Sequence, residues 1–192
     1  MAKKILEYLH ELCYSIFRVE VCRESGDTMS KFDYELEKMA NDILVKNDTF
    51  KLPVDLITIA NNNDIDVYKQ QLPDGISGAI RYNDSTKRFQ ILLEERESIN
   101  RQRFTLAHEL AHFFLERGKL LLNQEVHFDP KFRSYHNKEE ERVDYLAGAI
   151  LMDKKMLSVL YKINPSIPAL AKTFRVSESS MTVRLMILGL IK

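Results

Sequence analysis

The run FTLAHELAHFFLE, residues 104–116, constrains the fold of this chain more than any other stretch. Apolar side chains occupy almost every position around its helical circumference, and a helix that is apolar on all sides is normally buried. His108, Glu109 and His112 nevertheless lie within it. Burying ionisable groups costs free energy unless they are paired or bound to a metal ion. The stretch therefore predicts a buried site in which something satisfies these three side chains.

The spacing of the three residues favours a metal ion. They form the pattern H-E-x-x-H, and residues four apart on a helix share one face, so both imidazoles can bind a single ion. Glu109 would then be able to take a proton from a metal-bound water. The alternative is a buried helix whose histidines form hydrogen bonds in the core, as a lone histidine would suggest. Two histidines at ligand spacing, with a carboxylate between them, favour metal binding.

A catalytic zinc site takes three protein ligands and leaves one position for water, so a third ligand is expected on another element. The run NKEEERVDYLAGAILM, residues 137–152, predicts a helix with several carboxylates near its start. Helical periodicity turns Glu140 and Asp144 toward the core. The neighbouring Glu139 and Glu141 flank them and point outward, as is usual for glutamates in the first turn of a helix.

The rest of the chain predicts an α+β fold. An amphipathic helix is expected over residues 31–45 and a short helix after Pro53. Three segments with β-branched residues, joined by tight turns, predict a small antiparallel three-stranded sheet packed on the helices. The segments are residues 65–72, 77–83 and 88–94.

The helix with the H-E-x-x-H pattern is expected to begin near Ser98 or Asn100 and to end at Gly118. A long irregular loop, residues 119–137, would follow it, and such loops are often functional. An extra hydrogen-bond donor would be needed to stabilise the oxyanion of a tetrahedral transition state. The candidates in this loop are His127, Tyr135 and His136.

Composition excludes several other classes of protein. Lys plus Arg and Asp plus Glu number 28 each, so the net charge does not favour nucleic acid or anionic lipid. Cys13 and Cys22 are too few and too badly spaced for a disulfide framework or a cysteine zinc site. Charged residues interrupt the apolar positions near the N-terminus, so residues 1–28 predict a helical extension and neither a signal peptide nor a membrane span. A cytoplasmic protein is expected.

These residues resemble the ImmA/IrrE-type metallo-endopeptidases over roughly residues 32–191. The resemblance includes LPVDLITIA, DGISGAI, RQRFTLAHELAHFFL and E-x-x-x-D-Y-L-A followed by ILM. The usual family form of the last motif is E-x-x-A-N-x-F-A-x-x-L-L-M-P, and aligning ILMD with LLMP places the ligand glutamate at Glu140. Asp144 replaces the usual asparagine, an arrangement similar to that of thermolysin-like zinc peptidases. The resemblance implies that Asp144 orients the ligand His108.

The resemblance implies a zincin-like metallopeptidase domain over residues 29–163 that holds Zn²⁺, with Mn²⁺ as the alternative metal. Glu109 would serve as the general base. The implied substrate is a helix-turn-helix repressor, whose cleavage would relieve transcriptional repression in a mobile element or a stress response. Two other functions stay open: a DNA-binding regulator with a structural metal site, and a toxin-like protease paired with a neighbouring partner.

Residues 164–192 have the pattern of a helix-turn-helix, with Ser177 as the cap of the second helix. A helix that reads DNA needs lysine and arginine for contacts with phosphate. The second helix offers Arg184 and little else that is basic, while Glu178 opposes such contacts. Direct DNA binding is therefore not expected, and the segment is predicted to pack on the peptidase core or to guide substrate to it.

Overall fold

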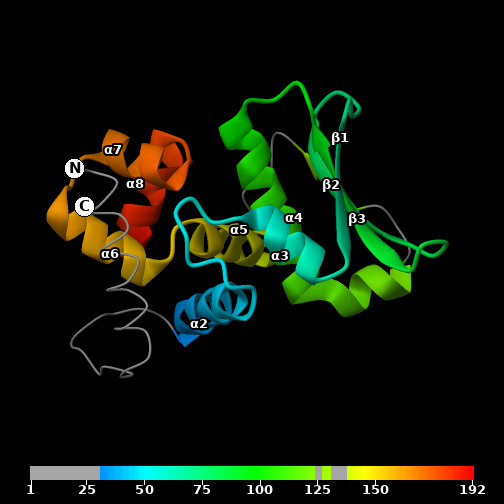
Figure 1. Cartoon of the computed structure of the whole chain (residues 1–192), viewed down its shortest axis with the longest axis horizontal. Helices are drawn as coiled ribbons and strands as arrows, with labels where there is room; N and C mark the ends of the chain where they lie inside the picture. The colour runs from blue at the N-terminus through cyan, green and yellow to red at the C-terminus, as the bar shows by residue number, and fades with distance from the viewer. Residues whose placement is uncertain (1–30, 124–126, 131–137) are drawn as a thin grey trace. The chain divides into compact units, whose positions relative to one another are not determined.

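The long helix α4, Ile99–Asn123, packs against one face of a mixed β-sheet (Figure 1). The computed structural model describes residues 31–123, 127–130 and 138–192, and residues Glu35–Lys192 form one unit. The expected N-terminal helix at residues 1–28 lies outside the described residues. The sheet has four strands in the order β1-β3-β2-β4. Their bounds are β1 Ile65–Gln70, β2 Ile76–Asn83, β3 Arg88–Glu94 and β4 His127–Pro130.

The sheet is mixed, so the prediction of a purely antiparallel sheet is wrong. Strand β3 pairs antiparallel with β2, as expected for a hairpin, but parallel with β1. Strands β1 and β2 are not neighbours, because the link between them, residues 71–75, passes the end of β3 instead of forming a hairpin. Glu94 fixes this link, since its buried carboxylate accepts hydrogen bonds from the Leu72 amide and from Arg96.

A fourth strand, β4, also lies outside the prediction. It falls within the segment that was expected to be an irregular loop, and it pairs antiparallel with β2. Helix α4 runs over Ile99–Asn123 but consists of two helical segments separated by a kink at Glu116, two residues before the predicted end at Gly118. Ser98 accepts a hydrogen bond from the Arg101 amide, in agreement with its expected place at the helix start.

The remaining helices begin where short polar side chains cap their first turns. Asp55, Asp153, Ser166 and Ser177 each accept hydrogen bonds from backbone amides of the helix that follows, which satisfies amides that have no partner within the helix. The bounds are α2 Lys31–Lys46, α3 Leu56–Asn62, α5 Lys138–Leu151, α6 Lys154–Ile163, α7 Ile167–Phe174 and α8 Glu178–Ile187.

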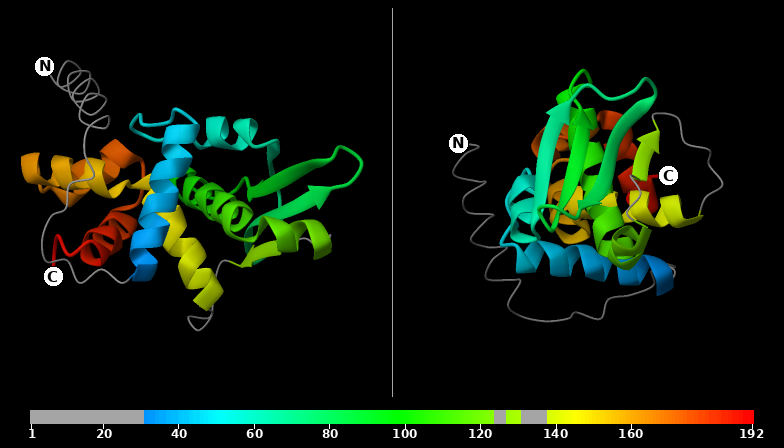
Figure 2. Two further views of the ribbon diagram at one scale, coloured as in Figure 1. Left: turned by 90° about the horizontal axis from the view of Figure 1, so that it is seen from below. Right: turned by 90° about the vertical axis from the view of Figure 1, so that its right-hand side faces the viewer.

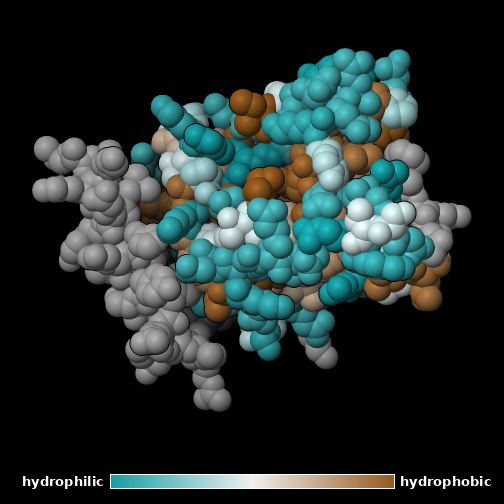
Figure 3. All heavy atoms as spheres, turned by 45° about the vertical axis from the view of Figure 1, so that its right-hand side comes forward, coloured by the Kyte–Doolittle hydropathy of each residue, from teal (hydrophilic) through white to brown (hydrophobic). Residues whose placement is uncertain are grey.

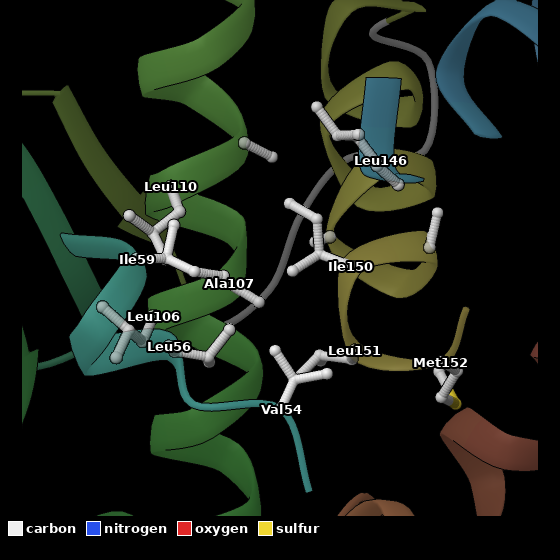
Figure 4. Close-up of a cluster of buried hydrophobic side chains, with 14 of the residues drawn as sticks. Val54, Leu56, Ile59, Leu106, Ala107, Leu110, Leu146, Ile150, Leu151 and Met152 are labelled. Carbon is white, nitrogen blue, oxygen red and sulfur yellow. The ribbon is translucent and has the colours of Figure 1, made fainter. Parts of the chain in front are cut away.

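The hydrophobic core lies between α4 and α5 and continues beneath the sheet (Figures 2 and 4). Ala107 of α4 lies on the side that faces Ile150 of α5, while Leu106 and Leu110 lie beside Ile59 of α3. Residues before and within α3 close one side of this cluster, and the residues that end α5 close another. Because the two helices share this packed interface, side chains on their adjoining faces are held at fixed separations. The further members are Val54, Leu56, Ile59, Leu151 and Met152.

Arg184 of α8 is buried at 2% exposure and joins three elements. Its Nη1 lies 2.7 Å from Glu37 Oε1, and its Nη2 donates to Glu37 Oε2 at 3.0 Å. Its Nε donates to the carbonyl of Met152, just after α5. Tyr145 of α5 donates its hydroxyl proton to the same Glu37 carboxylate at 2.9 Å. The cluster of Glu37, Tyr145 and Arg184 therefore connects α8 to α2 and to α5.

Hydrophilic residues predominate on the face shown in Figure 3, with apolar residues in small groups among them. Among the described residues, no helix has the length and apolar character needed to cross a membrane.

Candidate metal centre

Helix α4 places the imidazoles of His108 and His112 one turn apart on its buried face. The exposed fractions of the two residues are 0% and 1%. Their Nε2 atoms lie 3.0 Å apart, and their rings meet edge to face. A spacing of four residues on a helix produces this convergence directly. The two nitrogens therefore present ligand atoms to one point in the interior.

Glu140 reaches the same point from α5. Its Oε2 lies 3.4 Å from His108 Nε2, and its Oε1 lies 3.6 Å from His112 Nε2. One ligand atom from each of the three residues lies within 4.8 Å of the others. The contacts with His108 and then with His112 hold the pKa of Glu140 well below its usual range. The carboxylate is therefore ionised at neutral pH and can serve as a ligand.

A carboxylate also contacts the outer nitrogen of each imidazole. His108 Nδ1 lies 2.9 Å from Asp144 Oδ1, and His112 Nδ1 lies 2.8 Å from Glu116 Oε2. An ionised carboxylate only accepts hydrogen bonds, so each Nδ1 must carry the proton. In the neutral imidazoles, the lone pairs are then on the Nε2 atoms that face each other. Two lone pairs and a carboxylate that converge without a proton between them suit a divalent cation, and this donor set is typical of zinc.

Glu116 is a site residue that the sequence analysis missed. It lies four residues after His112, so its helical spacing was a usable signal. The non-helical dihedral angles of α4 occur at this residue (φ −130°, ψ 15°). Lys119 donates to Glu116 at 3.2 Å and to Glu139 at 2.8 Å, which joins the end of α4 to the start of α5. Glu139 thus points away from the ligand cluster, as its predicted outward orientation requires.

Glu109 is fully buried between α4 and strand β2. The closest approach of the strand occurs at Gly78, where a side-chain Cβ would lie 3.2 Å from Glu109 Oε1. Glu109 follows His108 directly in the sequence, so the carboxylate and the imidazole are anchored on the same turn of α4. The pattern H-E-x-x-H thus places the predicted base within a rigid helix, covered by the sheet.

The structure describes only the backbone of one of the three residues that were predicted to donate a hydrogen bond to the oxyanion. His127 belongs to β4, but its side chain is not described. Tyr135 and His136 lie outside the described residues. The assignment of an oxyanion donor to any of the three stays a prediction.

The fold and this cluster define a metallopeptidase-type domain, in which an H-E-x-x-H helix and a neighbouring helix supply a metal-site group of two histidines and a glutamate. The family model described as the IrrE N-terminal-like domain (Peptidase_M78) matches residues 60–186. The chain belongs to this peptidase family, in agreement with the resemblance seen in its sequence.

Comparison with solved structures supports the fold. A structure described as "Mycobacterium tuberculosis transcriptional regulator" matches 79% of this chain with a TM-score of 0.55 and 18% sequence identity. The chain spans about half, 46%, of the length of that protein. None of the curated proteins compared with the chain matches it.

Proposed function

We propose that this chain is a zinc-dependent endopeptidase that cleaves a helix-turn-helix repressor protein and thereby relieves transcriptional repression. The observation that carries the enzymatic part is the convergence of His108, His112 and Glu140 on one point, next in sequence to the buried Glu109. The proposal assigns residues 29–163 to the peptidase domain and residues 164–192 to a helical segment that packs on it. The substrate class rests on the resemblance to ImmA/IrrE-type peptidases.

The ligand residues fit a catalytic zinc ion, because three protein ligands leave one position open. When bound, the ion would polarise the scissile carbonyl and lower the pKa of a water molecule. Glu109 would accept the proton of the attacking water and later deliver it to the leaving amine. Asp144 and Glu116 would hold the imidazoles in the tautomer that presents Nε2 to the ion. The covering sheet would keep bulk water away from Glu109.

Glu109→Gln tests the peptidase proposal. The amide keeps the size of the side chain but cannot accept a proton at neutral pH, so we expect full zinc content and peptidase activity lower by about a hundredfold or more. Glu141→Gln is the matched control, since Glu141 is exposed on α5. Host cells that express either variant would be compared by labelling new protein N-termini. Identical N-termini in cells with wild-type protein and with the Glu109 variant would refute the peptidase activity.

The substrate class has a separate test. We expect a helix-turn-helix repressor gene next to this one, and its product would be purified and incubated with the wild-type protein and with Glu109→Gln. We expect one cut in the repressor with the wild-type protein alone. If the new N-termini in cells map to proteins without a helix-turn-helix, peptidase activity stands and the repressor assignment is wrong.

A DNA-binding regulator is the second candidate, because the matched structure from Mycobacterium tuberculosis is described as a transcriptional regulator. The geometry of α8 argues against DNA binding by this helix. The helix has one basic residue, Arg184, and this residue is buried against Glu37. Lys172 and Arg175 are exposed. They line one cavity of about 560 Å³ together with the acidic Glu178, which opposes contacts with phosphate. A gel-shift titration at low salt against the promoter of this gene decides between the two, and sequence-selective retardation would favour the regulator.

A further inference from the structure

Gly78 of β2 lies at the closest approach between the sheet and the catalytic helix. A Cβ at this position would collide with the methyl group Cγ2 of Thr105, one turn before Glu109. The same atom would lie 3.2 Å from Glu109 Oε1 on α4 and 3.2 Å from the carbonyl oxygen of Leu92 on β3. The space for any side chain is thus filled from both sides. Only glycine lets the backbone of β2 lie directly on the Glu109 carboxylate.

A bulge in β2 lies directly before this close approach. Ile76 pairs with Pro130 of β4 and Gly78 pairs with Asp129, so Ser77 is an extra residue on the β2 side. β-Bulges bend a strand and often occur beside active sites, where they redirect a side chain or the backbone. The bulge thus lies next to the point where Gly78 faces the turn of α4 that contains Thr105 and Glu109.

The bulged residue is held by side chains at the start of α4. Ser77 is buried, and its hydroxyl donates to Glu97 Oε1 at 2.9 Å and accepts from Arg101 Nη2 at 3.0 Å. Arg101 Nε also lies 3.7 Å from Glu97 Oε2. The bulge is therefore attached to the same helix that contains the H-E-x-x-H pattern. These hydrogen bonds hold β2 and α4 at a fixed separation at Gly78.

We propose that Gly78 is a positioning residue for Glu109: its missing side chain allows β2 to confine the Glu109 carboxylate on the side opposite α4. The role rests on the proposed peptidase function, in which Glu109 moves the proton. A carboxylate confined by backbone on one side and by its own helix on the other has few alternative rotamers. Even small misplacement of a catalytic group lowers the rate, by about a hundredfold for a displacement near 1 Å.

The first measurement is a double-mutant cycle on unfolding by urea, which needs no substrate. Gly78→Ala should lower the urea midpoint, and Thr105→Ser in the same protein should restore most of the loss by removing the methyl group that the new Cβ meets. Glu109→Ala should also make Gly78→Ala less destabilising. Gly148→Ala on α5 is the matched control, since a Cβ there meets nothing within 4 Å and the midpoint should not fall. Equal losses from Gly78→Ala with and without Glu109 would overturn the proposal.

The second measurement uses the folded double variant Gly78→Ala/Thr105→Ser. We expect zinc content and KM to match those of Thr105→Ser alone, while kcat falls at least tenfold because the Glu109 carboxylate is still displaced. Adding the same pair to Glu109→Gln should cause no further loss, because the base is already absent. An unchanged kcat, or an equal additional loss in the Glu109→Gln protein, would show that Gly78 only packs. If the wild-type protein cleaves no peptide, the peptidase proposal fails. The double-mutant cycle on unfolding by urea would still show whether the backbone at Gly78 confines the Glu109 side chain.

Discussion

His108 and Asp144 are joined across two helices by a hydrogen bond of 2.9 Å between Nδ1 and Oδ1. Partners of this kind fix the tautomer and the ring orientation of a metal ligand. We expect Asp144→Ala to lower zinc affinity by about ten- to a hundredfold, while Asp144→Asn, which keeps an acceptor, should lose less. Chelator competition measures the affinity. Glu141→Ala on the exposed side of the same helix should have the affinity of the wild-type protein, and an equal loss there would contradict the role of Asp144.

Zinc content should depend on all three residues of the cluster. We expect about one zinc ion per chain in the purified protein, and its loss in His108→Ala, His112→Ala or Glu140→Ala, because each removes a third of the protein ligands. Elemental analysis measures the content. Glu139→Ala is the control, because Glu139 pairs with Lys119 on the surface. Full zinc content in the Glu140 variant would mean that another carboxylate is the third ligand.

Glu116 should support His112 as Asp144 supports His108. Its carboxylate lies 2.8 Å from His112 Nδ1, so Glu116→Ala should weaken zinc binding by roughly tenfold or more in chelator competition. Lys119→Ala removes the surface partner of Glu116 without touching either histidine. If the two variants lose the same affinity, the surface ion pair and not the contact with His112 explains the effect.

Glu94 should contribute stability that disappears in acid. Hydrogen bonds from Arg96, and then from the Leu72 amide, hold the pKa of its buried carboxyl far below the usual range. A lowered pKa in the folded state stabilises the protein above the pKa of the unfolded chain, and this stability is lost as the pH falls through the ordinary carboxyl range. We expect Glu94→Gln to flatten the acid side of the curve of unfolding free energy against pH. The exposed Glu95→Gln should leave that curve unchanged.

Arg184 should be essential for stability. Removing one partner of a buried ion pair leaves an uncompensated charge, so Arg184→Ala should lower the free energy of unfolding by about 3–5 kcal/mol. Lys172→Ala, an exposed change within α7 in the same segment, should stay within about 0.5 kcal/mol of the wild-type protein. Denaturation by urea measures both. Replacing Glu37 and Arg184 together by apolar residues should recover part of the loss, and no recovery would contradict a buried-charge origin.

Local patterns in the sequence predict a large part of this fold. Helical spacing places His108 and His112 on one face, and the same periodicity separates the inward Glu140 from the exposed Glu139. These predictions succeed because they depend on residues within a few turns of one helix. The family assignment follows from the same motifs and is confirmed by the family model over residues 60–186.

The errors arise where distant segments decide the structure. The parallel pairing of β1 with β3 depends on Glu94 and Arg96, which hold the link at Leu72 from more than twenty residues away. Helix α4 is interrupted at Glu116, and a second helical segment continues through Gly118, because the backbone at this glycine does not take the left-handed φ that ends a helix. The close packing of Gly78 on Thr105 could not be read from a short pattern, because a strand and a helix must first be brought together.

Two adjacent faces of helix α5 make contacts with different parts of the protein. Asp144 contacts His108, and the very next residue, Tyr145, contacts Glu37. Each added or deleted residue would rotate the following part of the helix by about 100°. An insertion between Glu140 and Asp144 would therefore turn Asp144 and Tyr145 away from both contacts, while Glu140 kept its place. We therefore expect a one-residue insertion in this segment to break the contacts of α5 with both His108 and Glu37.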